Sequence, residues 1–106
     1  MNFENWTPHD VILVDINHNV IRTFPASGNV CRMDLERKLK CRLDNIDCYA
    51  SLSHGMTNIP RAVRGTYFIV STFVRVASGR GDFISPAGFI RDEEGKIIGC
   101  TSFDIN

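Results

Sequence analysis

The chain has 106 residues, of which 43% are hydrophobic and 23% are charged, and these values are typical of one folded domain rather than of a disordered segment. Twelve basic and twelve acidic residues give a formal net charge of zero, so no overall field favours nucleic acid or a membrane surface. The chain does not open with a basic segment followed by an apolar one, and no apolar run approaches the length of a membrane span. We therefore expect a cytoplasmic protein with no membrane contact.

The four cysteines do not form a metal-binding or disulfide pattern. None belongs to a Cys-x-x-Cys pair, and no histidine lies at zinc-finger spacing from one. Cys31 and Cys41 lie in apolar stretches, where a free cysteine behaves as a small hydrophobic residue. We expect reduced thiols, no metal and no cofactor.

The first half of the chain predicts two hairpins. Asp10 to Asp15 has the composition of a strand, and Val20 to Phe24 runs back after an Asn-containing turn. Residues 29–43 fit two structures, because leucines spaced by four favour a helix while apolar residues at odd positions favour a long strand. The hairpin-type turn at Asp44-Asn45, followed by an apolar return segment from Ile46 to Leu52, favours the hairpin.

The second half is centred on a strand. Residues 53–64 indicate an irregular connection, since they include Gly, Asn and Pro. Thr66 to Val70 is an unbroken aromatic and β-branched run, which indicates a strand covered on both faces. Ser71 is placed to cap a short helix over Thr72 to Ser78. Residues 79–88 are expected to form a loop.

A last hairpin is predicted with strands at 89–91 and 96–103 and with Gly95 in its turn. Five or more short strands and one short helical segment predict an α+β, mainly β fold, built as a curled antiparallel sheet or a partly open small barrel. Residues 1–106 are expected to form a single globular domain. The expected core residues are Ile12, Val14, Tyr67, Ile69, Val70 and Ile98.

Catalytic patterns are weak in this sequence. No Gly-x-Ser-x-Gly motif is present, and no two histidines have a metal-binding spacing. His9 and His54 are the residues that could serve as a base in an enzyme. Arg80-Gly81-Asp82 has two interpretations. It is either a surface ion pair, worth at most ~1 kcal/mol when exposed, or an anion site in which arginine binds phosphate bidentately.

The strongest charge feature runs from Arg37 to Arg42. In a strand it alternates and places Lys38, Lys40 and Arg42 on one face. These residues either protect an exposed strand edge or bind an acidic surface of a partner protein. Few aromatic residues interleave with them, so the segment gives no strong signal for nucleic-acid binding.

Five stretches of the chain carry a resemblance. They are Asn5-Trp6-Thr7-Pro8-His9, the turn and strand from Pro25 to Arg32, Gly65 to Ser71, Arg80-Gly81-Asp82 with the downstream Pro86, and Arg91 to Cys100. With these stretches, taken in the same order, the chain resembles a group of small uncharacterised proteins of phages, prophages and bacterial genomes. These proteins open with Asn-Leu-Thr-Pro-His. Their later motifs are Pro-Ser-Gly before Val-Ala-Arg, Gly-Thr-Tyr-Tyr-Ile-Val-Ser, Arg-x-Asp, and Arg-Asp-Glu-x-Gly-x-Ile-x-Gly-Cys. The resemblance spans nearly the whole chain and supports the hairpin over the helix.

The resemblance implies a phage setting, in which small proteins without an enzyme motif often block host defence. Its polar positions are candidate ligand-binding residues that can converge on one pocket: Thr7, His9, Ser27, Arg32, Ser71, Arg80 and Asp82. In this hypothesis Arg32 and Arg80 bind phosphate, while His9, Ser71 and Asp82 bind a base or ribose.

We therefore expect a non-enzymatic binding protein of the host-cell cytoplasm that counters bacterial immunity. It would sequester a nucleotide-type signal or occupy an immune effector protein. The alternative is a small hydrolase or nucleotide-modifying enzyme with a histidine base. Self-association into a homo-oligomer is left open.

Overall fold

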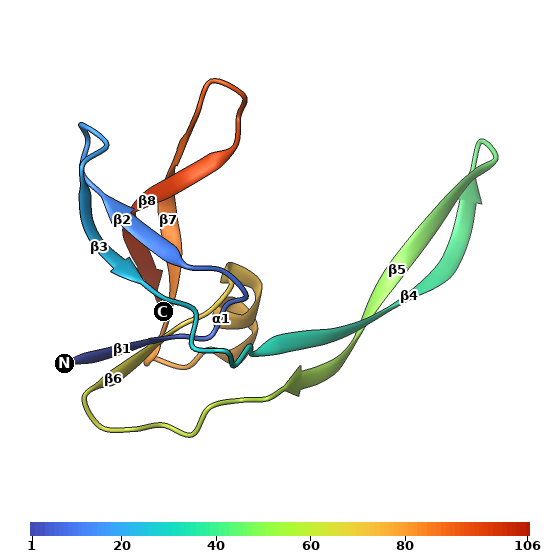
Figure 1. Ribbon diagram of the computed structural model, residues 1–106. Helices are drawn as coiled ribbons and strands as arrows, with labels where there is room; N and C mark the ends of the chain where they lie inside the picture. Colours follow the sequence, from blue (N-terminus) through green and yellow to red (C-terminus); the bar gives the residue numbers. More distant parts are fainter.

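A computed structural model describes all residues from 1 to 106 and shows six strands in one sheet beside a separate two-stranded hairpin (Figure 1). The sheet has the order β1-β6-β7-β8-β2-β3. Its strands are β1 (Asn2–Asn5), β2 (Val11–Val14), β3 (Val20–Phe24), β6 (Thr66–Ile69), β7 (Phe83–Arg91) and β8 (Ile97–Ile105). The hairpin consists of β4 (Arg32–Leu43) and β5 (Ile46–Thr57), and α1 (Thr72–Ser78) follows β6. The predicted mainly β fold with one short helical segment is confirmed.

Pairing within the six-stranded sheet is mixed. β1 with β6, β6 with β7 and β2 with β8 run parallel, whereas β7 with β8 and β2 with β3 run antiparallel. The sequence predicts antiparallel pairing, because tight turns mark antiparallel neighbours. Parallel neighbours need long crossover connections that leave no comparable local signal.

The sheet curls until its two ends meet, without closing into a barrel. A single bridge joins Asn5, at the end of β1, to Ala26, just after β3. The backbone N–H of Ser27 donates to the carbonyl oxygen of Asn5 at 2.9 Å. The curl therefore depends on a junction only a few residues long.

The side chain of Asn5 holds this junction together. It is buried, with 2% of its surface exposed. Its Nδ2 group donates to the carbonyl oxygens of Phe24 at 2.9 Å and His9 at 2.8 Å. Its Oδ1 atom accepts from the backbone N–H of Thr7 at 2.9 Å and from the Thr7 hydroxyl at 2.6 Å. All four hydrogen-bonding positions of the amide are thereby used.

β6 lies between β1 and β7 and is covered on both faces, as its unbroken apolar sequence predicts. Ile69 is fully buried inside the curl, in a cluster with Val11, Phe24, Ile84 and Cys100. Phe68 and Val70 face the other way, in a cluster with Cys31, Val74 and Phe83. Two apolar layers thus meet at this strand.

The short helix α1 covers the second cluster. Ser71 is its N-cap, and the Ser71 side-chain oxygen accepts from the N–H of Val74 at 3.2 Å. The helix ends at Gly79, whose φ of 65° lies in the left-handed region that favours glycine. The sequence prediction of this helix and of its cap is confirmed.

The hairpin of β4 and β5, hereafter the arm, projects away from the sheet (Figure 1). Its two-residue turn lies at Asp44 and Asn45, with φ of 48° and 64°. Positive φ at both central residues is what a tight hairpin turn of the I′ type requires. The hairpin predicted over residues 29–52 is therefore confirmed, and the helix alternative is wrong. β5 continues to Thr57, so residues 53–57 belong to a strand rather than to the expected irregular connection.

Other expectations need correction. Residues 2–5 form a strand that the sequence did not indicate, and residues 83–88, expected to be a loop, belong to β7 because both β6 and β8 pair with it. Ile98 is 41% exposed, since it lies near the projecting end of the β7–β8 hairpin. Val14, Ile69 and Val70 are buried as predicted, whereas Ile12 and Tyr67 are half-buried.

Replacing Asn5 by alanine should destabilise the fold. The change removes the partner of two main-chain carbonyl groups at the junction, and such unsatisfied groups cost about 1–3 kcal/mol each. We expect Asn5→Ala to lower the free energy of unfolding by about 2–4 kcal/mol, measured by urea denaturation. Asn2→Ala, at an exposed position of the same strand, is the matched control. Equal stability of the two variants would contradict this role of Asn5.

Candidate functional site

A groove runs between the segment that joins β1 to β2, the start of α1 and the β7–β8 hairpin. Its central part is lined by polar residues, including Thr7, His9, Ser71 and Lys96, together with apolar residues such as Phe89. At one end the groove continues along β8 into a hollow that shares Phe89. At the other end Thr7 and Ser71 also line a hollow at the base of the arm.

Four of the seven predicted ligand-binding residues lie along this groove. Thr7, His9 and Ser71 line its centre, and Arg32 lines the hollow at the base of the arm. They come from three segments that the sequence separates widely. The sequence hypothesis placed all seven residues in one pocket, with Arg80 and Asp82 beside His9 and Ser71. The structure brings only these four together along the groove, and Ser27, Arg80 and Asp82 lie elsewhere.

Two of these four side chains already make hydrogen bonds within the fold. The Thr7 hydroxyl donates to Asn5 Oδ1, and the Ser71 hydroxyl oxygen accepts from the N–H of Val74. These bonds fix the positions of both hydroxyl groups at the groove wall.

Two cationic side chains and one histidine ring line the groove without a partner. The His9 ring, the Arg32 guanidinium and the Lys96 ammonium have no hydrogen bond or ion pair within the chain, and all three residues are exposed. Asp10 adds one carboxylate, and its Oδ1 atom accepts from the backbone N–H of Ala26 at 2.9 Å. The groove therefore offers more unpaired positive than negative groups to a ligand.

Apolar residues of the β7–β8 hairpin form part of the groove wall. Pro86, Phe89 and Ile97 line it, and the Phe89 side chain is 49% exposed. Exposed aromatic and proline surface can take the flat face of a ring. Together the wall and the cations suit a ligand with a planar ring and an anionic group.

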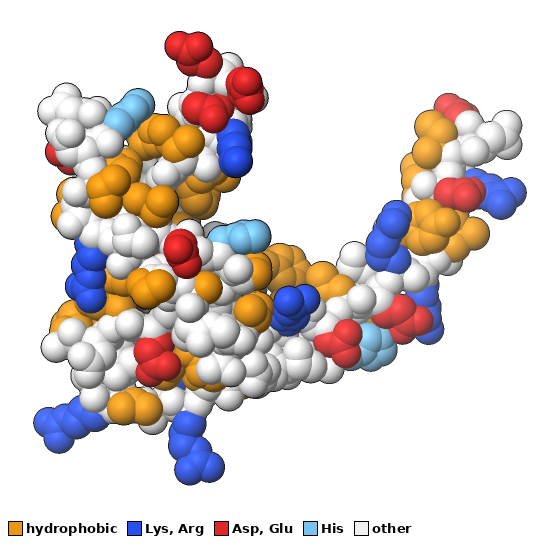
Figure 2. Space-filling view, in the orientation of Figure 1, with side chains coloured by type: hydrophobic (Ala, Val, Ile, Leu, Met, Phe, Trp, Pro, Cys, Tyr) orange, Lys and Arg blue, Asp and Glu red, His pale blue; other side chains and the backbone are white.

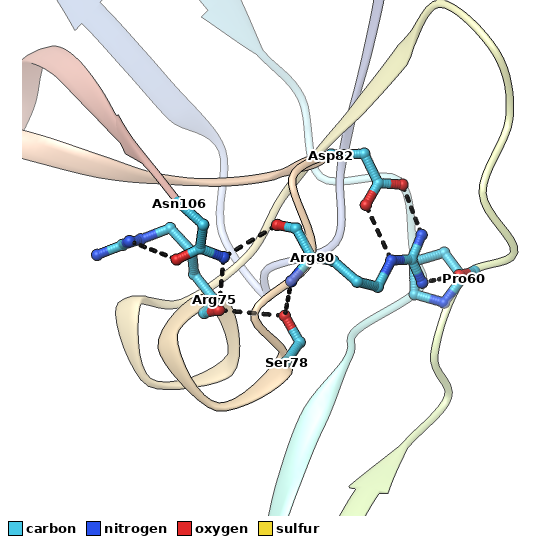
Figure 3. Close-up of polar contacts among 6 residues, drawn as sticks. All are labelled: Pro60, Arg75, Ser78, Arg80, Asp82 and Asn106. Carbon is cyan, nitrogen blue, oxygen red and sulfur yellow. Dashed lines mark hydrogen bonds and ion pairs between the residues drawn. The ribbon is translucent and has the colours of Figure 1, made fainter.

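Arg80 and Asp82 form a separate structural contact (Figure 3). Arg80 Nε donates to Asp82 Oδ1 at 2.8 Å, and Nη2 donates to Oδ2 at 2.6 Å. The remaining nitrogen, Nη1, donates to the carbonyl oxygen of Pro60 at 2.6 Å. The guanidinium also lies over the Phe83 ring, 4.3 Å from its centroid.

This pair is partly buried, with 26% of the Arg80 and 24% of the Asp82 side chain exposed. The hydrogen bond from Arg80 holds the pKa of the Asp82 carboxyl below its usual value. The sequence analysis left open a surface ion pair and an anion site, and the structure shows the ion pair. The pair is not confined to a surface loop, because Arg80 also ties the end of α1 to the segment that follows the arm. Neither residue lines the groove.

Asn106 strengthens the same region. Its Nδ2 group donates to the carbonyl oxygens of Arg75 and Arg80, both at 2.9 Å, and its Oδ1 atom accepts from Arg75 Nη1 at 2.9 Å (Figure 3). Arg75 Nε donates in turn to the buried Ser85 hydroxyl at 2.8 Å. These bonds fasten α1 to the ends of β7 and β8.

Ser27 lies at the junction of the sheet rather than in the groove. Its hydroxyl oxygen accepts from the N–H of Asn29 at 3.2 Å. This side-chain contact is local to the turn. Through its backbone N–H, Ser27 is also bonded to Asn5, which lies 22 positions away along the chain. Ser27 therefore belongs to the junction that closes the curl of the sheet.

The basic residues of the arm do not share one face. Cross-strand partners have side chains on the same face, and here Lys38 lies opposite Ala50 while Arg42 lies opposite Asp47. Ala50 and Asp47 are three positions apart on β5, so they face opposite ways. A bulge between residues 39 and 41 of β4 breaks the alternation that the sequence suggested. Lys40 lies within this bulge.

Two ion pairs lie on the arm. Arg42 Nε donates to Asp47 Oδ1 at 2.7 Å. His54 Nε2 lies 2.8 Å from Glu36 Oε2, so this histidine belongs to the arm and not to the groove. Lys96 and Asp10 are groove residues that the sequence analysis missed, since Lys96 occupies a variable position of its motif and Asp10 lies outside the motifs.

Comparison of the chain with protein-family models, with curated proteins and with solved structures found no match. The resemblance to small phage proteins therefore stays a sequence-based expectation. No three His, Cys, Asp or Glu residues are grouped so that they could hold a metal ion. None of the helical structure is both long and apolar enough to span a membrane.

Replacing Arg80 by methionine should lower stability. Methionine keeps an apolar stem over Phe83 but loses the bonds to Asp82 and Pro60, and charge-assisted bonds are worth about 1.5–3 kcal/mol. We expect a loss of this size in the free energy of unfolding, measured by urea denaturation. Arg61→Met is the control, because Arg61 is exposed and has no side-chain partner. A loss no larger than that of the control would show that the Arg80 contact is not structural.

Acid should weaken this contact. Because the pKa of Asp82 is lower in the folded than in the unfolded chain, its contribution is fully present above the unfolded-state pKa of roughly 3.9. The contribution is lost as the pH falls through the folded-state pKa. Asp82→Asn should therefore reduce the loss of unfolding free energy between pH 6 and pH 3, measured by denaturation at each pH. Asp104→Asn, at an exposed position without a side-chain partner, should show the wild-type slope, and an identical slope in Asp82→Asn would refute the assignment.

Proposed function

We propose that this protein is a non-enzymatic binding protein that takes a small anionic, nucleotide-type molecule into the groove and withholds it from a bacterial immune system. The observation that carries the proposal is the convergence of Thr7, His9, Arg32 and Ser71 on one groove. Unpaired cations and an apolar wall occur side by side there. A nucleotide presents the complementary pair of groups, a phosphate and a flat base.

Each part of such a ligand has a partner in the groove. A guanidinium binds phosphate with two parallel hydrogen bonds, which assigns the phosphate to Arg32 in the hollow at the base of the arm. The base lies against Phe89 and Pro86. Asp10 binds the ribose, in place of Asp82, to which the sequence analysis gave a contact with base or ribose.

Binding without conversion is favoured over the enzyme alternative. A nucleophile and its base must lie within hydrogen-bonding distance of each other. Ser71 Oγ accepts from the N–H of Val74 in the helix cap, and the His9 ring has no hydrogen-bonding partner that it could activate. His54 is paired with Glu36 on the arm. The enzyme alternative therefore depends on His9 as the sole catalytic side chain acting on a bound ligand.

The resemblance to small phage proteins provides the setting of bacterial immunity. A second candidate function within that setting is occupation of an immune effector protein. The exposed apolar surface of the arm favours it, because exposed apolar patches mark sites of protein interaction.

Mass spectrometry distinguishes binding from conversion. The protein is purified from phage-infected cells, denatured, and the released molecules are identified. An unchanged nucleotide supports sequestration, whereas a cleaved product supports the enzyme alternative. If the denatured protein releases no nucleotide-type molecule, the proposal is wrong.

Arg32→Ala should weaken binding of the released molecule about 10- to 150-fold, because one charge-assisted hydrogen bond is worth about 1.5–3 kcal/mol. Isothermal titration calorimetry measures the affinity. Arg61→Ala is the matched control, since both arginines are exposed and unpaired, and both variants should keep the wild-type melting temperature. Wild-type affinity in Arg32→Ala would place the ligand outside this groove.

A further inference from the structure

Two of the four cysteines lie directly opposite each other on the arm. In the register that joins β4 to β5, Cys41 pairs with Cys48. Opposite residues of an antiparallel pair have side chains on the same face and Cα atoms about 4.5–5.5 Å apart. A disulfide joins cysteines whose Cα atoms are about 4.4–6.8 Å apart. The backbone of the arm therefore holds these two cysteines at a separation that a disulfide can bridge.

The turn and the bulge of the arm together decide this pairing. Leu43 and Ile46 flank the turn and lie opposite each other, and Cys41 and Cys48 form the third pair from the turn. On the other side of the bulge, Leu39 lies opposite Tyr49. If that register continued toward the turn without the extra residue of the bulge, Cys41 would face residue 47. The bulge therefore places one cysteine opposite the other.

These two cysteines are accessible, whereas the other two are not. All four thiols are free, with Cys41 exposed and Cys48 half-buried. The Cys48 thiol donates to the carbonyl oxygen of Ile46 at 3.6 Å, within its own strand. Beyond its base the arm stands clear of the body (Figure 2), so a small molecule in solution reaches it. Cys31 and Cys100 belong to the two core clusters and are only 4% and 2% exposed.

We propose that Cys41 and Cys48 are an oxidation site, which a small-molecule disulfide such as oxidised glutathione converts into an intramolecular disulfide across the arm. The Cys41 thiolate attacks one sulfur of the small disulfide, whose S–S bond breaks as one small thiolate leaves. The Cys48 thiolate then attacks the Cys41 sulfur of this mixed disulfide and displaces the second small thiolate. The two cysteines lose two electrons and two protons, and the small disulfide takes them up as two thiols.

The site lies where the arm has least support. At the base of the arm, Met33 and Met56 pack against the second core cluster. Near its tip the strands are joined by the turn and by the Arg42–Asp47 ion pair, whose side chains are 67% and 44% exposed. Such exposed pairs contribute little, and a lone two-stranded hairpin is marginally stable in water. A disulfide closes this end of the arm and restricts its unfolded conformations, so the oxidised arm is more ordered than the reduced arm.

Oxidation of the purified chain tests the proposal. The reduced protein is incubated with oxidised glutathione, its remaining thiols are blocked in denaturant, and it is digested with trypsin. Trypsin cuts after Lys40, Arg42 and Arg61, so mass spectrometry should find residues 41–42 joined by a disulfide to residues 43–61. Cys31 and Cys100 should be recovered as blocked thiols. A wild-type chain without this linked peptide, or with a disulfide at Cys31 or Cys100, would overturn the proposal.

The double variant Cys48→Ser/Ala50→Cys is the matched control. It keeps four cysteines and moves one thiol by two positions along the same face, to a residue that is also half-buried. Diagonal neighbours on paired strands are about 7–8 Å apart, which is too far for a disulfide without movement of the backbone. We expect at least ~10-fold less intramolecular disulfide than in the wild type, with glutathione left attached to Cys41. Equal yields in the two proteins would show that the register does not select the pair and would overturn the proposal.

Hydrogen exchange tests the effect on the arm. Amide hydrogens of β4 and β5 near the turn should exchange roughly 10- to 100-fold more slowly in the oxidised than in the reduced protein. Those of β6 should exchange equally in both. Unchanged exchange near the turn would overturn the ordering of the arm by oxidation. Neither cysteine lines the ligand groove, so this proposal and the proposed function can fail independently.

Discussion

The buried amide of Asn5 is the constraint on which the rest of the structure depends. β1 and β3 are the two ends of the six-stranded sheet, and the junction beside Asn5 is where they meet. The same amide holds the hydroxyl of Thr7 and the carbonyl group of His9. The hydrogen bonds of Asn5 thus close the sheet and also position one wall of the groove, which gives a structural reason for Asn5, Thr7 and His9 in this sequence.

Features encoded by neighbouring residues could be predicted from the sequence. The turn at Asp44-Asn45 decided between helix and strand correctly, because both positions need a positive φ. Ser71 was placed as the helix cap from residue type alone, and the unbroken run at Thr66 to Val70 indicated a strand buried on both faces. In each case the deciding interaction lies within a few residues of the signal.

Features that depend on distant partners could not be predicted. The parallel pairing of β1 with β6 joins segments about 60 residues apart and leaves no periodic signal. One extra residue in β4 places Lys38 and Arg42 on opposite faces, and a bulge cannot be read from charge alternation. The ion pair of Arg80 with Asp82 was among the interpretations of the sequence, but the bond from Arg80 to Pro60 was missed because its acceptor is a main-chain carbonyl group. The same limit applied to Lys96, whose position in the groove depends on how the last hairpin folds back.

The strand order has a consequence for folding during synthesis. The arm is a local hairpin, which can form within about 1–10 µs once its residues are available. β1 and β2, by contrast, pair with β6 and β8, which belong to the second half of the chain. The first half of the chain must therefore wait for the second, and non-local pairing of this kind folds slowly. The arm is complete before the six-stranded sheet and exposes Leu43, Ile46 and Leu52, so it is the segment of the nascent chain most in need of protection from aggregation.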